Sequence, residues 1–506
     1  MDSSPTVRAA GARRKIIAIA IALGSAALLS ACAPAVRPSI FHPRDDVPLA
    51  GLPSDMTGWP QAQWWKFYAD PQLDRLMALA MRDSPDIEVA QARYRSASRA
   101  VEVQTAQLRP QGKGLVDAAH GYSDVSLQGA MPGATGSTQG FQLKPGSSYS
   151  NTGIAAVMFT WDLDLWGKQK SAVAAAVGQA NAARADRATA ESSLQYNLAA
   201  TYYDWQATQA RLKVAEEATR DAANYRVLVE ARVHAGLDDP QLLDSADSQV
   251  ARMRGNTAML AGSSQLDLAQ LAAIAGVSLA EIGTLRALPL PAVNAGLPAD
   301  AGIGLIARRA DIVAARWQIE ASSRSIDSAR AAYYPDVSLM AIGGFLRAYP
   351  DLGSGTRTDL TLGNIGPSVS LPIFSGGRLK AQLESSQAQL DTAVANYNRT
   401  VVQAAHDVAQ QVLTKQQIDA QRTEQDRQLA DSTSQLRRAG QRRDEGIEDD
   451  RTYLNTRMQR DQQVDAQLQL RAQQLSADLS LIHALGGGYR SDDVPSLPGA
   501  TAKDDH

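Results

Sequence analysis

Few side chains in this 506-residue chain have types and spacings that predict chemistry, and Cys32 is its only thiol. The six histidines show no metal-ligand spacing, and His483 near a helix end is expected to pack or cap. The glycine run at 486–488 is typical of a helix end, because no Lys-Ser or Lys-Thr pair follows it as in a phosphate-binding loop. We therefore expect no enzyme, no metal and no cofactor, which leaves the Cys32 sulfur as the one reactive group.

The residues around Cys32 have the order of a secretory signal. Basic residues at 13–15 precede an apolar stretch at 16–29, which is too short and wrongly flanked for a membrane-spanning helix. The run Leu29-Ser30-Ala31-Cys32 looks like a bacterial lipobox, which implies that the signal peptide is removed and that diacylglycerol and palmitate are attached covalently at Cys32. By the same resemblance, Ala33 implies sorting to the outer membrane, where several acyl chains anchor a protein stably.

Composition limits the class of protein further. A single cysteine excludes internal disulfides, so packing must stabilise the fold. Apolar residues make up 44% of the chain but aromatic residues only 5%, which favours long, closely packed helices. The net charge of −3 gives no global basic surface, so we expect no nucleic-acid partner. No run of 18 apolar residues follows Cys32, and we expect any passage through a membrane to be made by strands.

Proline placement predicts two long helices. No proline occurs between Pro145 and Pro240 or between Pro372 and Pro495, and proline is the strongest breaker of helix interiors. Allowing for strands at their starts, these windows predict helices over about 167–234 and 378–445. Each helix would extend roughly 100 Å. Helices of this length need a bundle or a coiled coil to bury them.

The chain also contains an internal repeat. A helical pattern that starts at Asp86 and stops at Pro110 recurs from Asp311 to Pro335, with the alternating three- and four-residue steps of a left-handed coiled coil. Each half is therefore expected to read helix, two short strands, long helix, tight turn, helix. The predicted seam positions are Ile87, Ala90, Tyr94, Ala97, Val101 and Leu108, then Ile312, Ala315, Ile319, Ser322, Ile326, Ala329 and Tyr333, and, in the second long helix, Leu390, Val394, Tyr397, Val401, Ala404 and Val408.

Segments rich in glycine, serine and threonine lie between the first helix and the long helix of each half. Apolar residues alternate with small or polar ones over 365–373, more weakly over 337–341, and most weakly over 114–124 and 150–161. This is the period of a strand between lipid and a wet lumen. The glycine-rich stretch 128–148 is expected to be an exposed loop. Four strands cannot enclose a pore, so several chains would have to pool their strands.

Several motifs in this order resemble the outer membrane factors of bacterial tripartite efflux and type I secretion, the TolC/OprM-like proteins, and specifically their NodT-type lipoprotein branch. The similarity covers nearly the whole mature chain. The motifs that carry it are Trp64-Trp65-Lys66-Phe67-Tyr68, Asp70-Pro71-Gln72-Leu73, Leu297-Pro298, Arg308-Arg309-Ala310-Asp311-Ile312, Tyr334-Pro335, Leu371-Pro372-Ile373-Phe374, Gly376-Gly377-Arg378 and Ala484-Leu485-Gly486-Gly487-Gly488-Tyr489.

The resemblance implies an α+β membrane protein with an internal twofold repeat. It implies a homotrimer in the cell outer membrane, whose protomers pool four strands each into one transmembrane β-barrel that continues as a long coiled-coil α-helical barrel in the periplasm. Its implied function is a passive exit duct for small-molecule drugs or toxic compounds. The implied partners are outer membrane lipid, a periplasmic adaptor (membrane fusion) protein and an inner-membrane pump of the resistance-nodulation-division type.

Acidic residues follow both turn glycines, and the resemblance places these turns at the periplasmic mouth of the tube. We expect their carboxylates to focus a negative potential that favours cations, with Arg442, Arg443 and Arg451 as basic partners that hold the mouth shut. In an alternative reading, the same acids only solvate turns and cap helices. Relatives often carry Asp in a Leu-Asp-Ala run; Asp244 retains it in the first half and Asn455 replaces it in the second. The candidate gate residues are Asp238, Asp239, Asp244, Glu448, Asp449, Asp450, Arg451 and Asn455, with the turn glycines Gly236 and Gly446.

These observations predict five regions. They are a signal peptide (1–31), a lipidated N-terminal extended segment with the equatorial region (32–83), a first structural repeat (84–296), a second structural repeat (297–489) and a flexible C-terminal tail (490–506). Two other readings stay open. The exit duct of a type I protein secretion system would share this architecture, whereas a purely structural coiled-coil lipoprotein would explain the lipobox and the heptads but neither the strands nor the repeat.

Overall fold

The structure is a computed structural model that describes residues 36–47, 49, 58–125, 128–132, 138–142, 146–293, 296–350 and 358–491. The described chain forms two compact units. The first is built mainly from Ser98–Val177 and Ala321–Leu390, and the second from Ile40–Ala97, Gly178–Glu320 and the residues from Asp391 onward. Within the described ranges, none of the helices combines the length and the apolar character needed to cross a bilayer.

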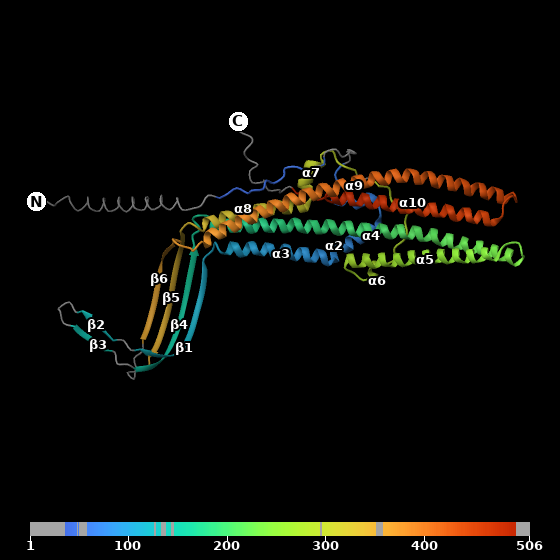
Figure 1. Ribbon diagram of the computed structural model, residues 1–506. Helices are drawn as coiled ribbons and strands as arrows, with labels where there is room; N and C mark the ends of the chain where they lie inside the picture. Colours follow the sequence, from blue (N-terminus) through green and yellow to red (C-terminus); the bar gives the residue numbers. More distant parts are fainter. Residues whose placement is uncertain are drawn as a thin grey trace, which may run out of the picture. The chain divides into compact units, whose positions relative to one another are not determined.

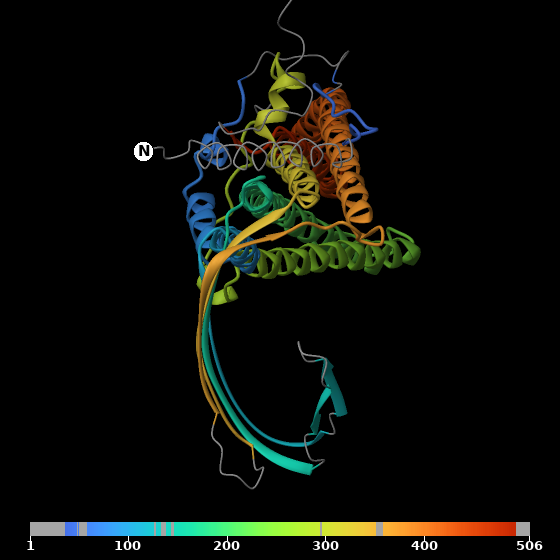
Figure 2. The ribbon, with the colours of Figure 1, turned by 90° about the vertical axis from the view of Figure 1, so that its left-hand side faces the viewer.

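The first unit contains an antiparallel sheet of four strands in the order β1-β4-β5-β6 (Figure 1). Figure 2 shows that these strands curve together in one direction. A separate pair, β2 and β3, lies in sequence between β1 and β4. The bounds are β1 (Gln111–Val125), β2 (Gln128–Pro132), β3 (Thr138–Gln142), β4 (Gly146–Asp162), β5 (Asp336–Pro350) and β6 (Thr358–Ser370).

The strands correct three sequence-based expectations. The sheet strands are 13 to 17 residues long rather than short. The stretch 128–148 is not a plain loop, because it contains the β2–β3 pair and the start of β4. The strand predicted over 365–373 ends at Ser370, two residues before Pro372.

The helices match the two proline-free windows. The long helices are α4 (Lys168–His234) and α9 (Arg378–Asp444), each of 67 residues, as predicted. Each is followed across a tight turn by a second helix, and each is preceded in sequence by strands and a 22-residue helix. The other bounds are η2 (Trp64–Tyr68), α2 (Pro71–Asp83), α3 (Pro85–Ala106), α5 (Pro240–Ala275), α6 (Leu279–Ile282), α7 (Ala301–Arg308), α8 (Ala310–Ala331) and α10 (Asp450–Ala484).

The predicted seams lie on the inner faces of these helices. All six seam residues of α9, from Leu390 to Val408, are buried. In α8, Ile312, Ile319 and Ile326 are buried, whereas α3 buries Ala90 fully and the rest of its seam only partly. The 3.5-residue spacing therefore identified the packed face of each helix.

The core of the second unit gathers aromatic and aliphatic side chains around η2 and α2. Asp70 caps α2 by accepting hydrogen bonds from the backbone N–H groups of Gln72 and Leu73, and Pro71 occupies the first helical position, where its missing N–H costs nothing. The other carboxylate oxygen of Asp70 accepts a 2.6 Å hydrogen bond from the Tyr202 hydroxyl of α4. Other core residues are Trp64, Trp65, Leu73, Leu76, Met77, Leu198, Leu271, Leu475 and Leu479.

The glycine run at 486–488 ends α10 by packing against three separate segments. All three glycines have positive φ, and a Cβ at Gly486 would lie 1.9 Å from the Arg308 carbonyl oxygen. At Gly487 it would meet the Ser192 hydroxyl, and at Gly488 the Gln61 carbonyl. Nearby, His483 stacks on Tyr196 with ring centroids 4.9 Å apart. The run is a close-packed helix end, as the sequence predicted.

Candidate functional site

One face of the four-stranded sheet is largely apolar, and the Arg347–Asp359 ion pair lies on it farther along the strands. Directly paired residues of antiparallel strands lie on the same face, and Phe159 pairs with Ala341, which pairs with Ile365. Within one chain, 53% of Phe159 and 73% of Ile365 is exposed. The face comprises Val157, Phe159, Trp161, Val337, Leu339, Ala341, Phe345, Ile365 and Val369. An exposed apolar surface of this kind needs lipid or another chain to cover it.

The opposite face is mixed in polarity. Lys113, Met158, Ile342 and Asn364 lie side by side across the four strands, and Asp117 follows on β1. Leu115, Leu346, Leu360 and Leu362 lie on this same face. The sheet therefore has one largely apolar side, compatible with lipid, and one side of mixed polarity.

Tryptophans mark the end of the strands that leads into the helices. The Trp161 indole N–H donates to the Leu108 carbonyl at 3.0 Å, and the Trp166 indole N–H donates to the Pro335 carbonyl at 2.8 Å. Trp166 also stacks on Tyr334 with ring centroids 5.0 Å apart. Aromatic side chains with one polar edge are enriched at the boundary between hydrocarbon and water.

The two helical turns have matching backbone geometry in the second unit. Gly236 and Gly446 adopt φ of +69° and +72°, the left-handed conformation that glycine adopts without strain. Asp239 caps α5 through the Gln241 N–H, and Asp449 caps α10 through the Thr452 N–H. Two of the candidate gate acids are therefore helix caps, as the alternative reading of these acids expected.

Arg451 joins the two turns. Its guanidinium lies 2.6 Å from Asp238 of the α4–α5 turn and 2.7 Å from Asp449 at the start of α10. Asp238 also binds Arg232 of α4 at 2.8 Å. The hydrogen bond from Arg232, reinforced by Arg451, lowers the pKa of Asp238 below its usual range. Burial raises the pKa of Asp449, but hydrogen bonds from Thr452 and Arg451 have the larger combined effect. The pKa of Asp449 is therefore lowered as well.

The other predicted basic partners pair locally. Arg442 lies 3.1 Å from Glu448, and Arg443 lies 3.9 Å from Asp450 and stacks over the Tyr453 ring. Asp244 is exposed on α5 and Asn455 is half-buried on α10. Cys32, with the lipobox, lies outside the described residues.

Sequence reasoning missed two ion pairs of this network. Arg232 was not singled out, although a basic residue in the last turn of a helix is a recognisable signal. Farther along the same helices, Arg457 of α10 binds the nearly buried Asp221 of α4 at 2.9 Å. No sequence pattern relates these two residues, because their contact depends on how α4 and α10 pack.

Comparison with known proteins agrees with this geometry. The family described as outer membrane efflux protein matches residues 76–277 and 304–487. The multidrug resistance outer membrane protein MdtP of Shigella flexneri is 31% identical over 93% of this chain and 96% of its own length. MdtQ of Escherichia coli O157:H7, also named a multidrug resistance outer membrane protein, is 30% identical over 86% of this chain and 89% of its own length.

Solved structures show the same fold. The outer membrane protein VceC of Vibrio cholerae is 29% identical, with a TM-score of 0.69 over 85% of this chain and 100% of its own. The outer-membrane channel OprN is 25% identical, with a TM-score of 0.71 over 90% of this chain and 98% of its own.

The fold and the two-sided sheet define an outer membrane channel protein. The chain belongs to the outer membrane efflux protein family, and it acts in the outer membrane as an exit duct for efflux. This family is one of transport ducts rather than of enzymes, in keeping with the sparse chemistry of the side chains.

Proposed function

We propose that this protein is the passive outer membrane duct of a tripartite system that exports small-molecule drugs or toxic compounds. An inner-membrane pump, of the resistance-nodulation-division type, would supply the energy, and a periplasmic adaptor would connect the two. The naming of the MdtP and MdtQ relatives as multidrug resistance proteins favours small-molecule cargo over the protein cargo of type I secretion.

The sheet with one apolar face is the observation that carries the proposal. Its strands β1 and β6 each leave one edge unpaired within the described chain, and unpaired backbone groups are costly in hydrocarbon. Four strands are too few to enclose a lumen, so three protomers would pool theirs into one barrel. The sheet disfavours a purely structural coiled-coil lipoprotein, which has no need of an apolar strand face.

The helical half would form the periplasmic tube, built from two structural repeats. Each repeat would contribute one long helix and its partner, α4 with α5 and α9 with α10, and the acidic turns would form the mouth. Arg451 would hold the mouth closed by bridging Asp238 and Asp449. Leu237 and Ile447 beside the turn glycines are 63% and 62% exposed, and they offer an adaptor apolar contacts among the charges.

The lipid anchor would add to membrane attachment. Diacylglycerol and palmitate on Cys32 would hold the N-terminus at the outer membrane. The chain from Ile40 to Arg44 is fastened to α9, because the Ile40 and Arg44 N–H groups donate to Asp391 and Asn398. An anchor at Cys32 would therefore be followed within a few residues by a segment that is hydrogen-bonded to α9.

Drug susceptibility of a deletion strain tests the proposal. Loss of the gene should raise susceptibility to several unrelated drugs, the full chain should restore resistance, and a pump of the resistance-nodulation-division type should co-purify with it. Type I secretion would be favoured instead if the deletion strain kept its drug susceptibility but failed to secrete a protein, and if an ABC exporter co-purified with the chain.

A further inference from the structure

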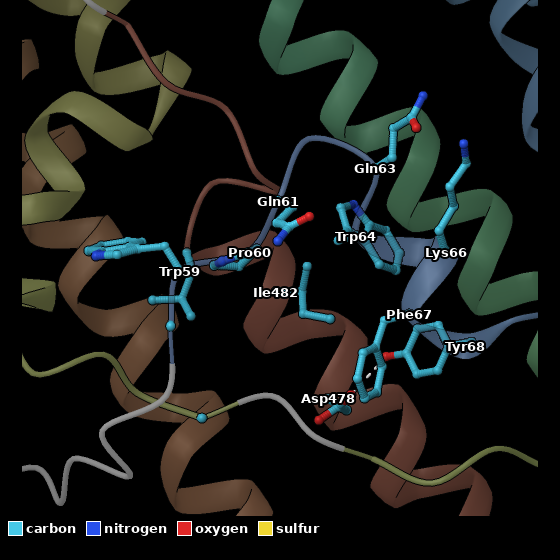
Figure 3. A pocket seen from close by; sticks show the side chains of 13 residues that line it. Trp59, Pro60, Gln61, Gln63, Trp64, Lys66, Phe67, Tyr68, Asp478 and Ile482 are labelled. Atoms are coloured by element: carbon cyan, nitrogen blue, oxygen red, sulfur yellow. Dashed lines mark hydrogen bonds between the residues drawn. The ribbon is translucent and has the colours of Figure 1, made fainter.

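In the second unit, α10 has two faces of different character. One face packs against η2, where the Tyr68 hydroxyl donates a 2.7 Å hydrogen bond to Asp478 and Ile482 joins the core (Figure 3). Gln473 and Ser480 lie about half a turn round the same helix, and neither is buried. The helix therefore separates an apolar core on one side from a polar surface on the other.

A groove of about 640 Å³ follows this polar surface between α4, α9 and α10. Hydrogen bonds join α10 to α4 (Tyr196 to Ser480, 3.0 Å) and to α9 (Gln474 to Asp419, 2.6 Å). The volume is in the range of sites for small molecules, about 300 to 1,000 Å³. Because η2 and α2 fill the other face of α10, the groove would open towards the lumen of the proposed duct.

Asp204 of α4 is the only charged residue among those described that line the groove. Its neighbours Tyr203 and Trp205 are buried in the core, whereas Asp204 is exposed. No described residue forms an ion pair or a hydrogen bond with its carboxylate. Partial desolvation raises the pKa of Asp204 to about 6, and the negative charge of Asp267 on α5 adds to the rise. The carboxylate is therefore mostly ionised at pH 7 and lacks a cation.

The rest of the polar wall is neutral. An amide offers both a donor and an acceptor, so such a wall can pair with several hydroxyl groups of one ligand. Six of its amide and hydroxyl side chains form no hydrogen bond with another residue of the described chain, namely Gln411, Thr414, Gln417, Gln421, Gln473 and Ser476.

This combination of groups disfavours three kinds of ligand. An apolar drug would cover the amides without replacing their hydrogen bonds to water, which costs free energy for each group. Asp204 and Asp267 would repel an anion. A bare metal ion needs several oxygen ligands close together, and no group of three acidic, histidine or cysteine side chains suited to a metal occurs in the part of the chain that the structure describes. The ligand that fits is an organic cation with several hydroxyl groups.

We propose that the groove binds hydroxylated organic ammonium ions, the chemistry of amino sugars, as they pass along the duct. An ammonium group would pair with Asp204, and hydroxyl groups would pair with the amides of Gln417 and Gln473 on the two facing helices. The inference rests on the proposed function, because an exit duct would bring such solutes to this face. It names polar cations as one class of compound that the duct exports.

Binding of the amino-sugar antibiotic kanamycin to the full chain in lipid nanodiscs tests the proposal. Calorimetric titration should show saturable binding. Asp204→Asn should weaken it by about tenfold, because the ammonium group loses a charged hydrogen-bond partner. Asp431→Asn is the matched control and should bind as the parent chain does, since it removes the same charge from an exposed position of α9 outside the groove.

Two further probes separate recognition of the whole ligand from simple attraction of charge. Trehalose has hydroxyl groups but no cation, and tetraethylammonium is a cation without hydroxyl groups. Each lacks one set of contacts and should bind about tenfold more weakly than kanamycin. The proposal is overturned if Asp204→Asn binds kanamycin as tightly as the parent chain, or if either probe binds as tightly as kanamycin.

Resistance of the deletion strain to an uncharged drug is measured separately with the same chain. A chain that restores this resistance but binds no kanamycin would overturn the binding site and leave the duct in place. A chain that binds kanamycin but restores no resistance would support the binding site and contradict the proposed duct.

Discussion

Single charged side chains decide how the two turns are connected. Arg451 reaches both Asp238 and Asp449, while Asp449 also caps α10. The cap is a local interaction that satisfies a backbone N–H at the start of α10. The Arg451–Asp238 contact instead joins residues 213 positions apart in sequence. Replacing Arg451 therefore breaks the connection between the two turns but leaves the Asp449 cap of α10 in place. The substitution tests the gate separately from the helix cap.

Arg451→Ala should raise the resting conductance of the channel severalfold without reducing trimer assembly. The reason is that Asp238 and Asp449 lose the cation between them and repel one another. Planar-bilayer recording of purified protein measures the effect. Arg427→Ala is the control, because Arg427 is an exposed arginine of α9 that pairs with nearby Glu424. Equal conductance in both variants and the parent chain would show that Arg451 does not hold the mouth closed.

Acid should have the same effect as the Arg451 substitution. The pKa values of Asp238 and Asp449 are lowered in the folded protein, so their contribution to stability is complete above the unfolded value of about 3.9 and is lost as pH falls through the lower folded value. Conductance of the parent chain should therefore stay level from pH 7 to about pH 5 and rise only below about pH 4. A rise centred near pH 6 would point to other groups.

Cys32→Ser should abolish incorporation of labelled palmitate, because no other thiol exists in the chain. Strand-driven insertion should continue in part, and the sheet should still bring the protein to the membrane. Metabolic labelling followed by membrane fractionation checks both points. Label that persists in the variant would show that the lipobox was assigned wrongly.

At the scale of elements, the helices were the most predictable part of the molecule. α4 and α9 begin and end at or next to the predicted residues, because proline-free windows and turn glycines bound them on both sides. The β2–β3 pair was missed because its residues have low strand preference, and pairing with a neighbouring strand determined the outcome.

Gly486→Ala should destabilise the end of α10 by about 2–4 kcal/mol, from left-handed backbone strain and overpacking. Its Cβ would lie 1.9 Å from the Arg308 carbonyl oxygen. Gly255→Ala, inside α5 with open space around it, should instead be neutral or stabilise by up to about 1 kcal/mol. Thermal unfolding monitored by tryptophan fluorescence compares the two, and an unaltered melting temperature for Gly486→Ala would mean that the glycine is not closely packed.

Ile365→Lys should impair insertion by about 2–4 kcal/mol, the effect of a lysine on the lipid face near the bilayer midplane. Asn364→Lys, one residue away on the opposite face, should insert normally because in the proposed barrel that face would line the water-filled lumen. Outer membrane fractions probed for heat-modifiable oligomer show the difference. If both variants inserted equally, the apolar face would not be the one that contacts lipid.

At the scale of the whole molecule, the sequence indicated that the strands of one chain cannot enclose a pore. The described structure agrees on the element that requires partners, because the four-stranded sheet has two edges and an exposed apolar face. The number of protomers does not follow from one chain, since the four strands and two edges of the sheet favour pooling without fixing how many copies pool. The number three is implied by the resemblance to the outer membrane factors, and it stays a prediction.

Single-channel recording, combined with the native mass of the same sample, tests the central claim most directly. The account predicts that the purified full chain is a trimer in mild detergent or nanodiscs and that this trimer opens a steady, cation-preferring conductance in a planar bilayer. It also predicts that dissociation to monomers abolishes the conductance together with the strand signal in circular dichroism. A monomer that retains its strand signal and conducts, or a trimer that never conducts even after Arg451→Ala, would contradict the account of a duct formed by pooled strands.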